Sequence, residues 1–284
     1  MNLIYFVRKF PGVVTTHQLA RALDKILSEK SFEKESTLLA TSLSCDEVCR
    51  DMEDELKDKF GQNYSFGGIG GFPFGGCTAF GAMCHHIPVG GNCLIVYGSH
   101  VGIDHDGVIG KVNRRGHKGS GVCCNTSIAS LAYVKAVKEG STIHMPDPSD
   151  PIDAQQVFVD SAMLKHSDRL LGAEDPMLEL PHAMFDCQTD LFKRIMDKCV
   201  KDIPEGTKFA ILGGVQVNTP EGMPDYFLPK RFDLYNSEGE AVEDALEELI
   251  KEGHVDVKAL LKQKKLDKMM AKAQEGLLNV QMNP

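Results

Sequence analysis

Short apolar segments alternate with helical patterns along this chain, and residues that bind soft metals follow two of the segments. Residues 36–44 (STLLATSLS) have the length and the Thr and Leu content of a buried strand, and Cys45 follows directly. Residues 92–97 (NCLIVY) form a second such segment, which leads into His100 after a glycine and a serine. This alternation predicts an α/β fold with a mostly parallel central sheet flanked by helices.

Helical patterns surround these two segments. Residues 15–27 repeat apolar positions at intervals of three and four, with Thr15 or Thr16 as the N-cap. Residues 46–60 are acidic in the first turn and basic in the last, and their apolar positions recur every fourth residue, at Val48, Met52, Leu56 and Phe60. Cys45 is therefore expected at a junction where a strand gives way to a helix.

The doublet Cys123-Cys124 opens another helical pattern, over residues 121–138. We expect both cysteines in its first turn, where unpaired backbone N–H groups and the helix dipole favour a thiolate. Further along, residues 153–171 and 189–201 predict helices, and residues 207–219 and 225–235 predict strands. In contrast, residues 61–121 hold 17 of the 27 glycines, which predicts tight turns in place of a packed helix.

The length of 284 residues suffices for the core of a single α/β domain over 1–284. Within it, residues 1–35 are expected to form an N-terminal helical arm. Residues 239–284 are expected to form a C-terminal extension of amphipathic helices.

Composition and charge exclude several classes of protein. The net charge of −9 argues against nucleic acid or an anionic membrane as partner, because both require clustered cations. No segment approaches the roughly 18 to 20 apolar residues of a membrane helix, and the N-terminus does not have the order of a secretory signal. Nine cysteines, an odd number, favour reduced thiols in an intracellular compartment over a disulfide framework.

Functional crevices of parallel sheets lie beyond the carboxyl ends of the strands, where Cys45 and His100 are expected. Cys124, at the start of the next helix, can reach the same edge. Two thiolates and an imidazole suit zinc, and three protein ligands leave a fourth position for water. Water bound to such a zinc ion ionises near neutral pH and attacks electrophilic carbon.

Several longer motifs resemble the limiting-CO2-inducible protein B/C family of algae and some bacteria. The resemblance spans about residues 10–235 in continuous order, and it includes TSLSCDEVCRDME (41–53), GGIGGFPFGGCTAFGAMCHHIP (67–88), YGSHVGID (97–104), GKVNRRGH (110–117) and SGVCCNTSIA (120–129). The resemblance implies a fold similar to β-type carbonic anhydrases, a zinc ion held by Cys, His and Cys, and a homodimer. Some members interconvert CO2 and bicarbonate, and others are inactive.

The resemblance implies Cys45, His100 and Cys124 as zinc ligands, with Cys123 as the rival for the third place. β-Type carbonic anhydrases also carry an Asp and an Arg in the order Cys-x-Asp-x-Arg. Here Asp46 follows Cys45 at once and Arg50 comes later, so the spacing departs from that pattern. Asp46 and Arg50 are the candidates for this pair, and the alternative is a helix cap beside a surface arginine.

We therefore expect a zinc-dependent carbonic anhydrase in which hydroxide on zinc attacks CO2, with Asp46 orienting the hydroxide and Arg50 keeping Asp46 ionised. Arg114 and Arg115 are expected either to attract bicarbonate at the site mouth or to be exposed. The alternative is an inactive zinc-bearing scaffold, or a CO2- or bicarbonate-binding subunit of a CO2-concentrating assembly. The signatures of zinc deaminases and of C-x-x-C redox proteins are absent from the sequence. The compartment is expected to be the cytoplasm or the chloroplast stroma.

Overall fold

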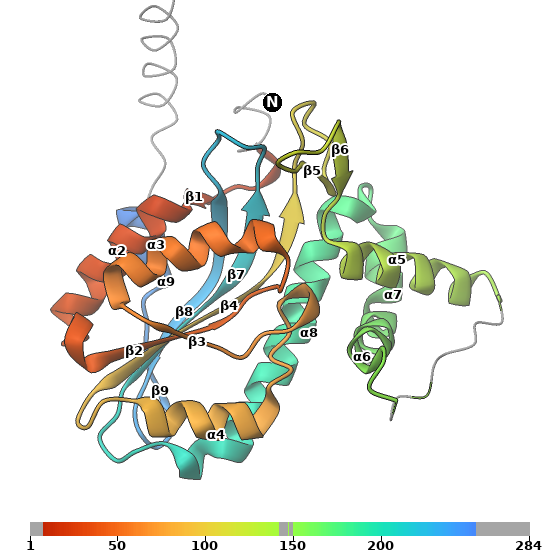
Figure 1. The fold of residues 1–284 in the computed structure, drawn as a ribbon. Helices are drawn as coiled ribbons and strands as arrows, with labels where there is room; N and C mark the ends of the chain where they lie inside the picture. The colour runs from red at the N-terminus through yellow and green to blue at the C-terminus, as the bar shows by residue number, and fades with distance from the viewer. Residues whose placement is uncertain (1–7, 142–146, 148–149, 254–284) are drawn as a thin grey trace, which may run out of the picture.

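The computed structural model describes residues 8–141, 147 and 150–253. Its centre is a seven-stranded sheet in the order β1-β8-β7-β4-β2-β3, with β9 also paired to β8 (Figure 1). Four neighbouring strands are parallel: β3 (Asn63–Ser65), β2 (Thr37–Ser42), β4 (Asn92–Gly102) and β7 (Phe209–Asn218). This confirms the predicted α/β fold with a mostly parallel sheet.

The remaining strands of the sheet pair with their neighbours in antiparallel fashion. β8 (Tyr226–Tyr235) pairs with β7, and both β1 (Val14–Thr15) and β9 (Ala241–Asp244) pair with β8. A separate hairpin of β5 (Lys111–Asn113) and β6 (Ser120–Val122) stands above the carboxyl end of β4 in Figure 1. The hairpin therefore lies at the edge of the sheet where a site was predicted.

One face of the sheet is covered by α2 (Thr16–Glu29), α3 (Arg50–Phe60) and α9 (Leu246–Glu252). Thr15 is the N-cap of α2, and its hydroxyl accepts the N–H of Gln18 at 3.1 Å in a capping box. Leu19 and Leu23 of this helix are fully buried in the cluster formed with β2, β4 and β7. The helix expected in the N-terminal arm thus packs directly on the sheet.

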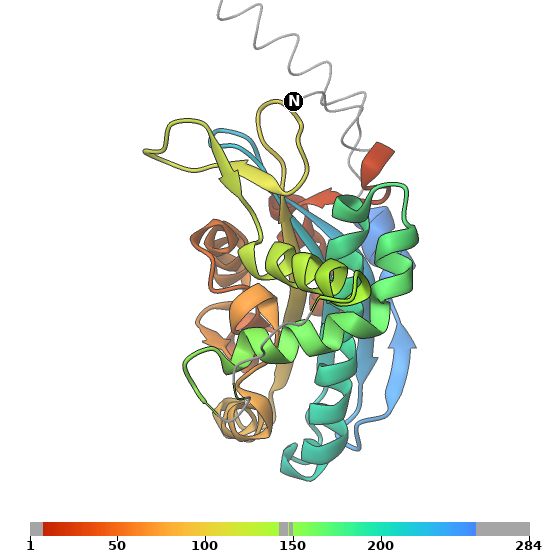
Figure 2. The ribbon, with the colours of Figure 1, turned by 90° about the vertical axis from the view of Figure 1, so that its right-hand side faces the viewer.

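The other face is covered by α4 (Gly76–His86) and α8 (Pro176–Cys199). Phe192 of α8 stacks on Tyr97 of β4 with ring centroids 4.9 Å apart, and Phe80 of α4 packs edge-on against Phe192. α5 (Asn125–Lys138), α6 (Ala154–Met163) and α7 (Ser167–Gly172) form a further layer outside α8 (Figures 1 and 2). None of the helices in the described part of the chain has the length and apolar character needed to cross a membrane.

The structure differs from several predicted elements. The glycine-rich region contains the helix α4, because its apolar residues Phe80 and Met83 gain burial that outweighs the cost of Gly81. The doublet precedes α5, with Cys124 as its N-cap, in place of lying in the first turn. Residues 241–244 form the edge strand β9, so the C-terminal extension is not wholly helical; residues 254–284 lie outside the described residues. The proposed division into arm, domain and extension stays a prediction.

Candidate metal centre

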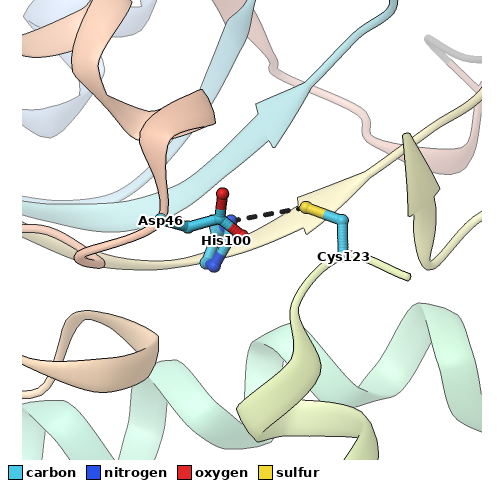
Figure 3. Close-up of side chains that lie close together, drawn as sticks. All are labelled: Asp46, His100 and Cys123. Carbon is cyan, nitrogen blue, oxygen red and sulfur yellow. Dashed lines mark hydrogen bonds between the residues drawn. The ribbon is translucent and has the colours of Figure 1, made fainter. Parts of the chain in front are cut away.

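Three side chains that offer metal ligands converge at the carboxyl end of the parallel strands. Asp46 follows β2, His100 lies near the end of β4, and Cys123 follows β6. Their ligand atoms all lie within 4.8 Å of one another (Figure 3). The cluster is thus formed at the sheet edge that the sequence predicted.

Close backbone approach brings Cys123 to this edge. The Cys123 N–H donates to Gly110 O at 2.9 Å, and the Gly102 N–H donates to Cys123 O at 3.2 Å. A Cβ atom on Gly102 would lie 2.8 Å from the Cys123 Cβ and 2.7 Å from the Lys111 carbonyl oxygen. Glycine is therefore required at position 102 for the hairpin to pack against the end of β4.

Thiol groups surround the buried imidazole of His100. The Cys123 Sγ lies 3.6 Å from His100 Nδ1, and Cys49 and Cys124 also interact with the ring. Burial lowers the pKa of His100, but the surrounding thiols outweigh it and raise this pKa well above its usual value. Burial likewise raises the pKa of Cys124, but His100 and Ser127 outweigh it and lower this pKa to about 7.

Asn218, the last residue of β7, fixes the tautomer of His100. Its Nδ2 donates to Val48 O at 2.7 Å and to Asp225 Oδ2 at 2.8 Å, which leaves Oδ1 facing His100 Nδ1 at 3.0 Å. Nδ1 therefore donates its proton to Oδ1, and Nε2 is the ring nitrogen that would release its proton on binding a metal ion. Nε2 is buried without a hydrogen-bond partner among the described residues, as expected of a nitrogen that takes a metal ion.

Asp46 is held by an arginine from the β5–β6 hairpin. Arg114 Nη1 donates to Asp46 Oδ1 at 2.7 Å and Nη2 donates to Oδ2 at 2.9 Å, with side-chain exposures of 17% and 16%. Burial raises the pKa of Asp46, but the Arg114 hydrogen bonds outweigh it and hold this pKa well below its usual range. Asp46 is therefore ionised, with both oxygens engaged. It also caps the 3-10 turn Glu47–Cys49 by accepting the Val48 N–H at 3.3 Å.

The structure does not form the expected pair of Asp46 with Arg50. Arg50 begins α3 and turns to Glu53, one helical turn on, at 2.6 Å, and it also donates to the Ser44 carbonyl. The arginine partner comes from a distant hairpin, so the local spacing could not reveal it. The sequence predicts Arg114 as an attractor of bicarbonate or as an exposed residue, and neither expectation includes the contact with Asp46.

Cys45 also lies apart from the cluster. Its side chain is exposed, whereas Cys49 is fully buried with its Sγ 4.0 Å from Asn218 Oδ1. Two residues before Asp46, where the Cys-x-Asp pattern has cysteine, this chain has Ser44, whose hydroxyl accepts the Asp46 N–H at 3.3 Å. The structure brings together Asp46 and His100 of the predicted residues, with Cys123 in the group and Cys124 beside it.

Sequence reasoning missed Cys49 and Asn218. Cys49 precedes Met52 by three positions and Glu53 by four, and all three residues are buried. A buried helix face that begins at Cys49, one position after Val48, would have indicated that Cys49 points inward. Asn218 lies in the predicted strand 207–219 and ends β7, at the same edge of the sheet. A search for every polar residue at a strand end would have found it.

Comparisons with known proteins show which chains this one resembles in sequence and in fold. A profile of the family described as limiting CO2-inducible proteins B/C β-carbonic anhydrases matches residues 13–236. The crystal structure of PtLCIB4, a homologue of the limiting CO2-inducible protein LCIB, is similar with 40% identity and a TM-score of 0.80, over 86% of this chain and 99% of that one. A mutant of PtLCIB4 is similar with 39% identity and a TM-score of 0.80, over 85% and 97%.

The crystal structure of LCIB shares the fold, with 17% identity and a TM-score of 0.62, over 84% of this chain and 96% of that one. No curated protein matches the chain in sequence. The profile and the PtLCIB4 structures each cover most of the chain. This chain therefore belongs to the limiting CO2-inducible protein B/C family of β-carbonic anhydrase-like proteins.

Proposed function

We propose that this chain is a zinc-dependent carbonic anhydrase that interconverts CO2 and bicarbonate. Family membership supports the reaction class. The observation that carries the proposal is the ionised Asp46, held by Arg114 within 4.8 Å of the ligand atoms of His100 and Cys123. A metal site with a fixed carboxylate beside it is suited to activating and orienting water.

The donor set fits zinc. His100 offers the orphaned Nε2, Cys123 offers one thiol, and a second thiol is available from Cys49 or Cys124. Nitrogen and sulfur donors of this number are typical of zinc. Because Arg114 engages both oxygens of Asp46, this carboxylate would lie beside a bound metal ion without serving as its ligand. A zinc ion held there supplies the Lewis acidity that lets water attack CO2 near neutral pH.

The residues of the chain have separate roles in this reaction. Asp46 cannot take up a proton near neutral pH, since Arg114 holds its pKa low, so it accepts a hydrogen bond from the reacting water and orients it. Asn218 keeps the proton on His100 Nδ1 and fixes the ring plane. The homodimer and the compartment inferred from the resemblance and the cysteine content stay predictions.

Elemental analysis and stopped-flow CO2 hydration test the proposal together. We expect about one zinc per chain, retained in Cys45→Ser, whose thiol is exposed, and reduced in His100→Ala and Cys123→Ser. Asp46→Asn should keep zinc and slow hydration by roughly 100-fold, the effect of misplacing a reacting group. A zinc-loaded protein that hydrates CO2 no faster than a protein-free blank would refute the enzyme and leave a zinc-bearing scaffold.

Cobalt substitution identifies the second thiol ligand without recourse to activity. Thiolate-to-cobalt charge-transfer absorption scales with the number of bound sulfurs, so removal of one of two thiol ligands should lower it by about half. We expect this loss in Cys123→Ser and in only one of Cys49→Ser and Cys124→Ser. An unchanged spectrum in both of the latter would contradict a second thiol from this cluster.

A further inference from the structure

A groove of about 590 Å³ lies away from the metal centre, between the start of α4, the helix α6 and the last turns of α8. None of its lining residues belongs to the cluster of Asp46, His100 and Cys123. Its volume falls in the range of small-molecule sites, which are mostly apolar with a few polar groups. The groove is thus large enough for a ligand that the proposed reaction does not use.

The walls of the groove are mainly apolar. Phe74 and Phe158 meet edge-to-face with ring centroids 5.5 Å apart, and Val157, Leu191 and Ile195 extend this surface. Phe158 is 36% exposed, although it packs against the fully buried Phe72. Aromatic surface left open in a groove gains free energy when an apolar group covers it.

The charged residues that line the groove are both cations. Arg194 and Lys198 lie four residues apart on α8, hence on the same side of the helix, and among the described residues no acidic side chain lines the groove. Within the part of the chain that the structure describes, neither has an ion-pair partner. Like charges at this spacing repel, so an anion between them is favoured. This local positive charge contrasts with the net charge of −9.

We propose that the groove binds an organic anion that has an unbranched apolar chain and one carboxylate. The apolar chain lies against Phe74 and Phe158, and the carboxylate pairs with Arg194 and Lys198. A cationic amphiphile of the same length has the same apolar contacts but meets two like charges, so the groove selects the anion.

The exposed Cys77 in the groove provides a direct measurement. The full-length, zinc-loaded protein is treated with iodoacetamide with and without dodecanoate below its micelle concentration, and alkylation is followed by peptide mass spectrometry. Cys45 is also exposed but lies outside the groove, so it serves as the internal reference. Dodecanoate should slow alkylation of Cys77 at least fivefold and leave Cys45 unchanged. Dodecyltrimethylammonium should protect neither.

Binding is measured in parallel by calorimetry. Arg194→Gln/Lys198→Gln should weaken dodecanoate binding at least tenfold, whereas the matched control Lys193→Gln/Lys201→Gln, outside the groove, should change it less than twofold. Equal protection by the cationic amphiphile, or no protection of Cys77, would overturn the proposal. A third outcome is that Cys77 does not react even without ligand and that gel filtration shows a dimer. This outcome would assign the groove to contact with a second copy of the chain, and it would also overturn the proposal.

Discussion

The pairing of Asp46 with Arg114 can be tested by a double-mutant cycle on stability. Asp46→Asn removes the charge but keeps the side-chain oxygen that caps the turn at Val48, because Asn and Asp are equally good caps. Arg114→Gln removes the guanidinium. Arg114 also contacts Glu47, and this contact is lost in both the Arg114→Gln single variant and the double variant. Its energy therefore cancels from the coupling energy.

The expected coupling follows from the geometry and the exposure of the pair. The pair forms two charge-assisted hydrogen bonds, of 2.7 and 2.9 Å. Their coupling energy should therefore exceed the zero to about 1 kcal/mol that exposed ion pairs contribute. Both side chains keep some contact with solvent, at 17% and 16% exposure, which reduces the coupling below that of a fully buried pair. We therefore expect about 2 kcal/mol at pH 7, measured by urea unfolding of zinc-free protein so that metal binding does not contribute.

The matched control is the cycle of Asp46→Asn with Arg50→Gln. Arg50 contacts Glu53 and Ser44 instead of Asp46, so its coupling to Asp46 should be under about 0.5 kcal/mol, the usual limit of additivity. The pH dependence adds a second check. Since the folded-state pKa of Asp46 is lowered, its stabilisation is complete above the unfolded value of about 4 and is lost as the pH falls through the folded value. A coupling that is larger for Arg50 than for Arg114 would refute the assigned pair.

Three further results follow from the structure. Asn218→Leu should weaken zinc binding by roughly 10- to 100-fold in a chelator competition, because His100 Nδ1 loses the oxygen that orients the ring. An unchanged zinc affinity would contradict this role of Asn218. In zinc-free protein, a pH titration of thiolate absorbance at 240 nm should show a component with a midpoint near pH 7, because the pKa of Cys124 is lowered to about 7. This component should vanish in Cys124→Ser. A first midpoint above pH 9 in the wild type would be inconsistent with the lowered pKa. Phe192→Ala should cost about 3 to 5 kcal/mol in urea unfolding, because the ring is buried and stacks on Tyr97; a loss under 1 kcal/mol would show that this layer repacks freely.

Periodicity predicted the elements that place the site, because each follows from local chemistry. The stripe of α2, the buried segment that became β2, and the strand that ends near His100 are all local patterns of apolar residues. The carboxyl ends of parallel strands meet at one edge, so the edge itself was also predictable. α4 was not, since its glycines masked the burial of Phe80 against Phe209, a contact made only in the folded protein.

Which neighbouring cysteine faces the cluster could not be predicted, because it depends on how the helix begins. Asp46 caps a 3-10 turn before α3, and that turn leaves Cys45 exposed and Cys49 buried. A helix starting one residue earlier would rotate each side chain by about 100° and change which sulfur faces inward. The local pattern of apolar residues is compatible with either start.

The β5–β6 hairpin supplies the arginine that pairs with Asp46, which the local Cys-x-Asp-x-Arg order would place close by in the sequence. β5 and β6 deliver two groups at once: Arg114 follows β5 and reaches Asp46, and Cys123 follows β6 and reaches His100. Arg114 also donates to the Val122 carbonyl, beside Cys123, so the ion pair and the thiol are held by the same few residues. A metal ion bound by Cys123 therefore stabilises the hairpin conformation that places Arg114 on Asp46, and the ion pair in turn holds Cys123 in place. By this reciprocity, breaking the ion pair should weaken zinc binding. We expect this in Arg114→Gln/Asp46→Asn, which leaves no freed carboxylate to bind the metal, whereas Arg50→Gln should leave the affinity unchanged. Equal zinc affinity in these two variants, measured by chelator competition, would show that the hairpin is held without the ion pair.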